Sequence, residues 1–447
     1  MKKNDIIHLH IESLSSDGSG VGRAEGLVVF TPMCCAGDEI EAHLLKVKKQ
    51  YAFAKIHRIL TPSPDRIEAD CTVYKQCGGC AFRHMRYEAE AAQKQKMVDD
   101  ALARIGRLDL KTEGILTLSP ERYRNKAQYP VREENGKVVA GFFAKHSHRV
   151  VACEDCLLEP ALFGEIIRAI LYFMEQNHIR AYNEQTHTGL VRHIFLRCAQ
   201  GGDALALCLV LNGTALPHQA EFVRFMSGTF TCIQSIVLNV NTAKTNVILG
   251  ETYRTIYGAD VIEDTLLGKR FQISAASFYQ VNHDMCERLY TKAAEYAALQ
   301  AGETLVDVYC GAGTVGICLA NETTRLIGVE VVPEAVENAA KNAALNQLEN
   351  ARFLCADAAQ ATAVLKQEGI QADCVVVDPP RKGCDEQTIE NIAAFGASRI
   401  VYISCDPATL ARDLKRFEQK GYTARRACAA DMFARTAHVE TVVLLTK

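Results

Sequence analysis

The stretch TLVDVYCGAGTVG, residues 304–316, gives the clearest fold signal in this 447-residue chain. Its first five residues form an apolar run, and glycines follow at positions 311 and 313 before a helical stretch begins. Glycines in such a turn let the backbone bend tightly and approach a ligand at the N-terminus of the helix. The stretch predicts a strand, a turn and a helix. By itself it is equally typical of an ordinary strand-to-helix connection.

Further apolar runs on the C-terminal side extend this pattern, and helical stretches separate them. They span residues 326–330, 374–378, 400–404 and 439–445. Short, continuous apolar strands separated by helices are typical of a parallel sheet that is covered on both faces. We therefore predict a doubly wound, Rossmann-like α/β domain over residues 267–447.

Two regions precede this domain. Residues 1–60 contain short apolar runs separated by glycine turns, which is typical of a small OB-like β-barrel. Pro62 and Pro64 interrupt both helix and sheet and indicate a linker. Residues 61–266 mix strand and helix patterns after a compact cysteine cluster, so we predict an α+β central domain that carries this cluster.

Charge and cysteine content narrow the class of protein. The net charge of −3 argues against a protein that coats nucleic acid, so any RNA contact depends on local patches such as residues 42–64, which hold five Lys or Arg and no acid. No apolar run is long enough to span a membrane, and the N-terminus lacks the apolar segment of a secretory signal. We expect a cytoplasmic protein, in which 18 cysteines indicate metal binding, catalysis or packing rather than disulfides.

Acidic residues follow the apolar runs beside the glycine turn. Glu330 ends the second run, where a carboxylate can bind both ribose hydroxyls of an adenosine-containing ligand. Asp357 follows another short run and is suitably placed to contact the adenine. Gly311, Gly313 and Gly316 also satisfy the Gly-x-Gly-x-x-Gly spacing of an NAD site, so this edge alone leaves the cofactor open.

The later runs carry reactive residues at their ends. Asp378 is held by two prolines and followed by Arg381, whereas an aromatic residue after the prolines would indicate methylation of an exocyclic amine. Cys405 follows the next run, where the N-terminus of a helix can lower the pKa of a thiol. A lone cysteine is more often inert and buried, but the convergence of four strand ends favours a nucleophile.

Thiolate attack on carbon 6 of a uracil makes carbon 5 reactive toward a methyl donor, and Glu440 could then remove the carbon 5 proton.

Taken together, the motifs resemble one family. They are Phe278-Tyr279-Gln280-Val281-Asn282, Asp307 to Gly313, Asp378-Pro379-Pro380-Arg381, Ser404-Cys405-Asp406-Pro407 and His438-Val439-Glu440-Thr441. Their order is that of the RNA uracil-5-methyltransferases, and the chain most resembles the iron–sulfur 23S ribosomal RNA enzymes with an N-terminal TRAM domain. The similarity covers nearly the whole chain, and residues 1–60 look like the TRAM barrel.

The resemblance implies a role for each motif. Cys405 would be the nucleophile and Glu440 the proton acceptor, while Phe278 would lie beside an extruded base. The S-adenosylmethionine pocket would be lined by Gln280, Tyr309, Gly311, Gly313, Glu330, Asp357 and Asp378. Further contacts with the RNA are expected from Asn282, Arg124 and Lys126.

The cysteine cluster has two possible ligands. Cys71, Cys77 and Cys80 surround two glycines, and such thiols can ligate either zinc or an iron–sulfur cluster. The resemblance implies a [4Fe–4S] cluster with Cys156 as its fourth ligand. Cys153 forms a Cys-x-x-Cys pair with Cys156 and is the alternative.

Two other functions remain open. One is a tRNA uracil-5-methyltransferase with the same chemistry, although its usual forms lack the TRAM barrel and the cysteine cluster. The other is an iron–sulfur RNA-binding protein with an inactive methyltransferase fold, against which the intact set Gln280, Asp378, Cys405 and Glu440 argues. We expect a monomer that acts on 23S ribosomal RNA, with no membrane and no protein partner.

Overall fold

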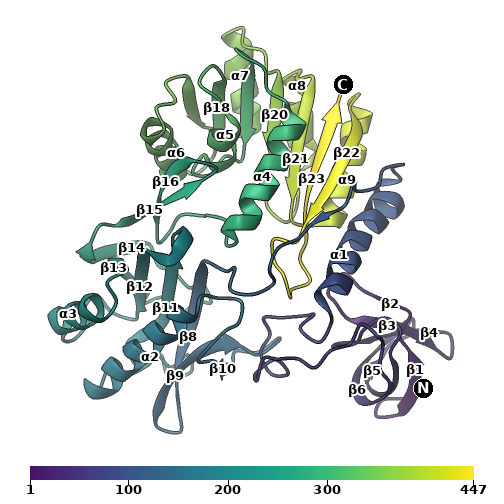
Figure 1. The fold of residues 1–447 in the computed structure, drawn as a ribbon, viewed down its shortest axis with the longest axis vertical. Helices are drawn as coiled ribbons and strands as arrows, with labels where there is room; N and C mark the ends of the chain where they lie inside the picture. Colours follow the sequence, from purple (N-terminus) through teal and green to yellow (C-terminus); the bar gives the residue numbers. More distant parts are fainter.

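The computed structural model describes residues 1–447, which form three sheets of six or more strands and one separate hairpin (Figure 1). The first sheet has the order β1-β5-β6-β4-β3-β2. Its strands are β1 (Ile6–His10), β2 (Ser13–Leu14), β3 (Gly20–Ala24), β4 (Leu27–Thr31), β5 (Glu39–Val47) and β6 (Tyr51–Thr61). β1 also contacts β3, so the sheet curls around a small apolar core of its own. The predicted OB-like barrel is confirmed.

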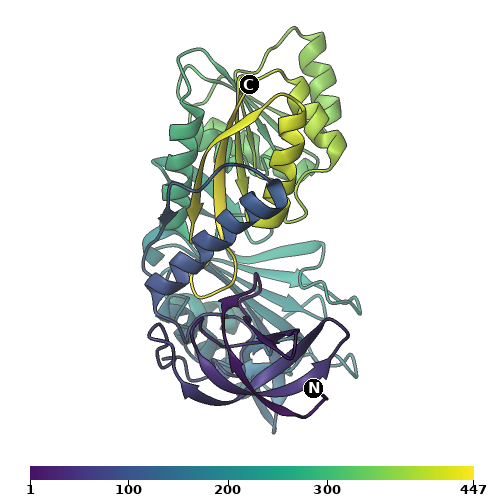
Figure 2. The ribbon, with the colours of Figure 1, turned by 90° about the vertical axis from the view of Figure 1, so that its right-hand side faces the viewer.

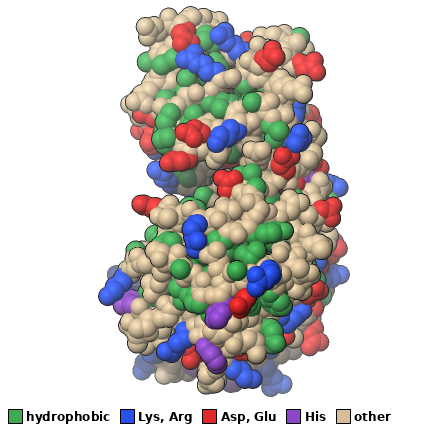
Figure 3. Space-filling view, turned by 90° about the vertical axis from the view of Figure 1, so that its left-hand side faces the viewer, with side chains coloured by type: hydrophobic (Ala, Val, Ile, Leu, Met, Phe, Trp, Pro, Cys, Tyr) green, Lys and Arg blue, Asp and Glu red, His purple; other side chains and the backbone are tan.

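The central domain contains a seven-stranded sheet in the order β10-β9-β8-β11-β12-β13-β14. Only β12 and β13 pair in parallel, and α2 (Ala161–Gln176) and α3 (Gln219–Thr229) pack on the sheet. The strands are β8 (Lys126–Glu134), β9 (Lys137–Phe143), β10 (Val150–Ala152), β11 (Val191–Cys198), β12 (Leu205–Leu211), β13 (Ile233–Val240) and β14 (Thr252–Gly258), with a short 3₁₀ turn at Gln200–Gly202. Charged side chains are scattered over the face in Figure 3, as the small net charge leads one to expect.

The C-terminal sheet has the order β19-β18-β17-β20-β21-β23-β22-β7, with its first five strands parallel. The strands are β17 (Thr304–Val308), β18 (Arg325–Glu330), β19 (Ala351–Cys355), β20 (Cys374–Val377), β21 (Arg399–Ser404), β22 (Thr423–Ala430) and β23 (Glu440–Thr446). The helices are α4 (His283–Ala297), α5 (Thr314–Leu319), α6 (Pro333–Leu345), α7 (Ala358–Gln367), α8 (Glu386–Ala394) and α9 (Pro407–Gln419). They cover both faces of the sheet, so the predicted doubly wound, Rossmann-like fold is confirmed. A hairpin of β15 (Val261–Leu266) and β16 (Lys269–Ser274) precedes it.

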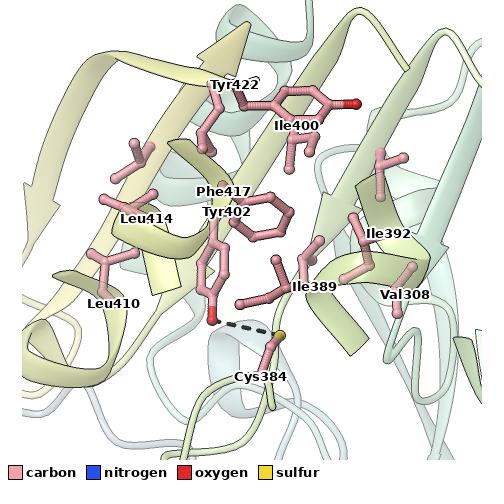
Figure 4. Packing of buried hydrophobic residues seen from close by; sticks show 14 of the residues in the cluster. Val308, Cys384, Ile389, Ile392, Ile400, Tyr402, Leu410, Leu414, Phe417 and Tyr422 are labelled. Atoms are coloured by element: carbon pink, nitrogen blue, oxygen red, sulfur yellow. Dashed lines mark hydrogen bonds between the residues drawn. The ribbon is translucent and has the colours of Figure 1, made fainter. Parts of the chain in front are cut away.

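Two apolar clusters fix this sheet from its two faces. Figure 4 shows part of one of them, in which Tyr402 of β21 packs edge-on against Phe417 of α9. The Tyr402 hydroxyl lies 3.7 Å from the Cys384 sulfur and donates to the buried carboxylate of Asp413 at 2.8 Å. Hydrogen bonding of this kind lets polar groups sit inside an apolar layer without a large penalty.

One N-terminal segment crosses to the C-terminal domain. Helix α1 (Tyr87–Ala101) continues into a π-helical turn (Leu102–Gly106) and then into β7 (Ile115–Leu116), which pairs with β22 at the edge of the sheet. Figures 1 and 2 show α1 between the barrel and the strands β22 and β23, and it contacts both β22 and α9. None of the helices is long and apolar enough to span a membrane.

Candidate active site

The ends of neighbouring strands meet at one edge of the C-terminal sheet. Tyr309 follows β17, Glu330 ends β18, Asp378 follows β20 and Cys405 follows β21. β23 begins at Glu440 and runs antiparallel to β21, so its first residue lies at the same edge. Side chains from five strands therefore face one region, which is where open α/β sheets bind their ligands.

The turn after β17 has the backbone that its glycines predict. Gly311 and Gly313 have φ angles of 53° and 82°, in the left-handed region, and Gly313 is the N-cap of α5. A Cβ on Gly313 would lie 2.9 Å from the Cδ1 atom of Ile317, whereas a Cβ on Gly311 would meet nothing within 4 Å. Tyr309 also has a positive φ, of 66°. The turn thus leaves its backbone open at position 311, where a ligand can approach it.

Backbone amides hold Glu330 at this edge. Its Oε2 accepts a hydrogen bond from the Gly311 amide at 3.2 Å, and its Oε1 accepts from the amides of Val331 and Val332 at 2.8 and 3.0 Å. These bonds fix the carboxylate beside the glycine turn, in the place expected for a ribose contact. Asp357 instead caps α7, accepting from the Gln360 amide at 2.8 Å, and its contact with an adenine stays a prediction.

Two carboxyl groups, the buried Glu440 and the half-buried Asp378, lie beside the thiol. Burial raises the pKa values of Asp378 and Glu440, and the negative charge of Asp378 raises that of Glu440 further. Glu440 is 4% exposed, and its Oε2 has no hydrogen-bond partner. Two carboxyls in such surroundings cannot both be ionised at low cost unless a cation lies near them. The site can therefore hold a proton on this pair.

Cys405 is half-buried, and its pKa is raised to about 11. Burial is the main cause, followed by the charges of Glu440 and Asp378, while Arg381 acts in the opposite direction. The expectation that the helix N-terminus lowers the pKa of this thiol is wrong for this structure. The carboxylate of Asp406 already accepts from the first amides of α9, at 3.0 and 2.8 Å, and so takes the place that a thiolate would need.

Arg381 and His438 are site residues to which sequence reasoning gave no role. The Arg381 guanidinium lies 3.3 Å from the His438 Nε2 atom and favours the ionised forms of both Cys405 and Glu440. Burial, and then the charge of Arg381, lower the pKa of His438, so its ring is neutral and can accept from the guanidinium. The signal in the sequence was an arginine directly after two prolines at a strand end.

The expected RNA-contacting residues differ in their surroundings. Phe278 is 71% exposed, as a residue that packs on an extruded base should be. Burial, followed by the charges of Arg197 and Arg124, lowers the pKa of Lys126 to about 8, so a phosphate nearby would favour its charged form. Asn282 is buried and caps α4, and its amide donates to the Met432 carbonyl at 3.1 Å.

Gln280 lies in the same segment as Phe278 and Asn282, and it is 8% exposed. Its backbone carbonyl accepts a hydrogen bond from the Asn125 amide group at 3.0 Å, which ties this segment to the start of the central sheet. A contact between the Gln280 side chain and a cofactor stays a prediction, as does contact of Asn282 with RNA.

Five cysteines of the central domain interact with one another, and none forms a disulfide: Cys71, Cys77, Cys80, Cys153 and Cys156. The backbone of Cys77 pairs with that of Ala144 in an isolated β-bridge. Burial together with the thiols of Cys77 and Cys71 raises the pKa of Cys80 to about 12. Cys156 interacts with Cys153 and Cys80. No group of three His, Cys, Asp or Glu side chains lies close enough to hold a single metal ion.

A separate cavity of about 670 Å³ opens in the central domain, away from the catalytic edge. It is lined by polar side chains of β8, of residues 147–149 and of residues 180–188. Arg132 forms an ion pair with Glu184 there. None of the strand-end residues described above lines this cavity, so we assign it no part in the chemistry.

The Rossmann-like sheet, its glycine turn and the acids along its carboxyl edge are the features of α/β enzymes that bind an adenosine-containing cofactor. Residues 236–447 match the family described as tRNA (Uracil-5-)-methyltransferase, and residues 7–64 match the TRAM domain of tRNA (uracil(54)-C(5))-methyltransferase. RNA methyltransferases of Halalkalibacterium halodurans and Listeria innocua are 40% and 41% identical to it, over 100% of this chain and 98% of theirs. The chain belongs to the tRNA (uracil-5-)-methyltransferase family and has an N-terminal TRAM domain.

One solved structure is similar along nearly the whole chain. It is the tRNA (uracil-54, C5)-methyltransferase of Pyrococcus abyssi in complex with S-adenosyl-L-homocysteine, with a TM-score of 0.78 and 25% identity. The similarity covers 98% of this chain and 100% of that one. The overall fold is therefore shared between them.

Proposed function

We propose that the protein methylates carbon 5 of a uridine in 23S ribosomal RNA, in the cytoplasm, with S-adenosylmethionine as the methyl donor. The observation that carries this proposal is the convergence of Cys405, Glu440 and Arg381 at the edge that also holds Glu330. A nucleophile, a proton acceptor and a cation then surround one position beside a nucleotide-binding turn, as a covalent methylation of uracil requires.

The charges of the site fit this methyl donor. Asp378, Glu440 and Cys405 can all become anions, and Arg381 is the cation that acts on Cys405 and Glu440. When bound, S-adenosylmethionine supplies an electrophilic methyl group on a positively charged sulfur. Gln280, Tyr309, Gly311, Gly313, Glu330, Asp357 and Asp378 would hold it. The unpartnered Oε2 of the buried Glu440 supports a cationic ligand nearby.

The chain's own residues would act in order. Arg381 favours the thiolate of Cys405, which attacks carbon 6 of the uracil and generates an enolate at carbon 5. After carbon 5 has taken the methyl group, Glu440 accepts the proton from carbon 5, and the bond to Cys405 breaks. In its ionised form, which Arg381 favours, a carboxylate whose pKa is raised is a stronger proton acceptor than an exposed one.

The barrel offers a surface for unpaired RNA. Tyr51, Phe53 and Lys55 alternate on one face of β6, and all three are exposed. The rings of Tyr51 and Phe53 lie 5.5 Å apart, and Phe30 of β4 lies 5.8 Å from Phe53. Lys46 is paired with Phe53 across the sheet. Bases stack on exposed aromatic rings while lysines bind the phosphates, so this aromatic face supports binding of single-stranded RNA.

Two classes of RNA, ribosomal RNA and transfer RNA, fit this chemistry. The expected absence of a TRAM barrel from tRNA enzymes would argue against a tRNA substrate. That argument fails, because a TRAM domain is described for a tRNA methyltransferase and the similar P. abyssi structure is a tRNA enzyme. The resemblance of the cysteine cluster still favours 23S ribosomal RNA, and methylation of tRNA is the second candidate.

The test is to map 5-methyluridine by mass spectrometry in ribosomal and transfer RNA, from cells with and without the protein. We expect one or more sites in 23S ribosomal RNA to lose the methyl group and to regain it with the wild-type chain but not with Cys405→Ala. Loss confined to tRNA would establish the second candidate. Activity of Cys405→Ala would exclude the covalent mechanism.

We also propose that Cys71, Cys77, Cys80 and Cys156 hold a [4Fe–4S] cluster that shapes the RNA-binding surface, since methyl transfer moves no net electrons. The neighbouring thiols support this proposal. Each thiolate of such a cluster binds a different iron, so its sulfurs lie further apart than the ligands of one ion.

The metal content of protein purified without oxygen tests this proposal. We expect about four iron and four sulfide per chain, lost in Cys156→Ala but kept in Cys153→Ala and in the control Cys232→Ala. One zinc per chain, or no metal, would overturn it.

A further inference from the structure

The loop between β22 and β23, residues 431–439, leads directly into Glu440 and carries His438. Backbone groups of this loop bind residues from distant parts of the chain. The amides of Ala81 and Phe82 donate to the Arg435 carbonyl at 2.7 and 3.0 Å. The Tyr123 hydroxyl donates to the Ala434 carbonyl at 2.9 Å. The loop is therefore held by segments outside the C-terminal domain.

The strongest of these contacts is an ionic network with helix α1. The ammonium of Lys94 donates to Glu90 at 2.8 Å, to Asp431 at 2.6 Å and to the Phe433 carbonyl at 3.1 Å. Glu90 in turn accepts from the Arg435 backbone amide at 2.6 Å and lies 3.4 Å from its guanidinium. The side chains of Lys94, Glu90 and Asp431 are all fully buried.

Stability alone does not account for this network. Two acids and two bases buried together are often less stabilising than apolar residues of similar size, because each charge must be taken out of water. The charged side chains fix the position of the loop backbone, since Lys94 binds the Phe433 carbonyl and Glu90 binds the Arg435 amide. An apolar contact would leave these two backbone groups unpaired and the loop able to shift.

The loop connects this network to the reacting groups. Four residues separate Arg435 from Glu440, and one of them is His438. The His438 ring packs edge-on against Phe433 and lies 3.3 Å from the Arg381 guanidinium. Glu440 is the first residue of β23 and pairs with Ala430 at the very end of the ladder. A shift of the loop would therefore act on Glu440 at the frayed end of its strand, and it would move the acceptor of Arg381 directly. A misplacement of about 1 Å can lower a rate by about 100-fold.

We propose that Lys94 and Glu90 of α1 are positioning residues for the proton acceptor Glu440, acting through the buried network and the loop 431–439. The proposal rests on the function proposed above. The glycine turn after β17 and Glu330 at the end of β18, where the cofactor would bind, are held by backbone amides of their own segments and not by the network. Losing the network should therefore slow the removal of the carbon 5 proton while attack by Cys405 and methyl transfer continue, so that the covalent protein–RNA adduct accumulates.

The experiment compares Lys94→Met and Glu90→Gln with Lys96→Met in the full chain. Lys96 lies on the same helix and pairs with Asp100 at 2.5 Å, but its side chain is 56% exposed, which makes it a matched control. For each variant, kcat and KM, the Kd for S-adenosylmethionine and the amount of adduct that resists denaturant are measured. Thermal unfolding shows which variants are folded.

We expect Lys94→Met to lower kcat by about 10- to 100-fold at an unchanged Kd for the cofactor, with adduct accumulating. Glu90→Gln keeps the shape of the side chain and should show the same signature more weakly, and it decides the test if Lys94→Met does not fold. Lys96→Met should behave like the wild type. Folded variants with wild-type kcat, or with a lower kcat but no adduct, would overturn the proposal. If the wild-type chain itself methylates no RNA, the proposed function fails instead.

Discussion

Replacing Glu440 by glutamine tests the core of the chemistry. Glutamine keeps the shape of the side chain but accepts no proton. Loss of a general base lowers a rate by about 100- to 10,000-fold, and the side chain is too buried for water to take over this role easily. Cys405 and Arg381 remain in place, so the reaction should stop at the methylated adduct. Incubation with RNA and S-adenosylmethionine, followed by denaturing electrophoresis, should show nearly all of the variant in a slower band.

The same variant has a second, independent consequence for stability. The pKa of Glu440 in the folded chain is raised above 4.5, so the stability that this group contributes is present below pH 4.5 and is lost as the pH rises through its folded pKa. Each pKa unit of that shift costs the ionised folded state about 1.4 kcal/mol. Glu440→Gln should therefore unfold at a higher temperature than the wild type at pH 8.5, and the difference should shrink toward pH 5.5. Turnover within about tenfold of wild type, without adduct, would remove Glu440 from the base role.

Three further changes have defined outcomes. Phe53→Ala should weaken binding of single-stranded RNA by about tenfold, whereas Tyr172→Ala, which removes an exposed ring from the central domain, should leave it unchanged in a filter-binding assay. Arg381→Gln removes the cation that favours the Cys405 thiolate, so the rate of adduct formation should reach its plateau at higher pH; an unchanged pH profile would contradict this. Tyr402→Phe leaves a buried carboxylate short of one donor and should lower the free energy of unfolding by about 1–3 kcal/mol in urea, with wild-type kcat.

The strands of the C-terminal sheet could be predicted from the sequence because each is a short apolar run with both faces buried. The run 400–404, for example, differs from β21 by one residue at its start. The common location of the residues at the sheet edge could also be predicted, since parallel strands all present their carboxyl ends at one edge. Glu440 could be placed only through its motif, because the antiparallel direction of β23 is not evident from the pattern.

Other features depend on contacts between distant residues and left no local pattern. Lys94 and Glu90 are ordinary residues of a polar helix in the sequence, and Asp431 lies 337 residues from Lys94. Nothing in residues 87–116 indicates that they pack on the C-terminal sheet. The raised pKa of Cys405 was missed for a similar reason. The position before a helix was evident, but the capping role of Asp406 and the two neighbouring carboxyls depend on the fold.

The direction of β23 explains why the N-terminal segments matter for the chemistry. On a parallel strand, a residue at the carboxyl edge is followed by a loop, and the strand itself fixes its position. Glu440 instead begins an antiparallel strand, where it pairs with Ala430 of β22, so the loop before it and the end of this ladder together set where the carboxyl lies. That loop is bound by residues 81–82, by α1 and by Tyr123, while β7 completes the edge of the sheet beside β22. Val98, Leu102 and Leu108 belong to the same apolar cluster as β20 and β21, so without these side chains the domain would expose apolar surface. Without β7, the edge of β22 would also be unpaired. The C-terminal domain is therefore completed by residues 87–116, which lie far before it in the sequence. They contribute to its apolar core and hold the loop that precedes Glu440.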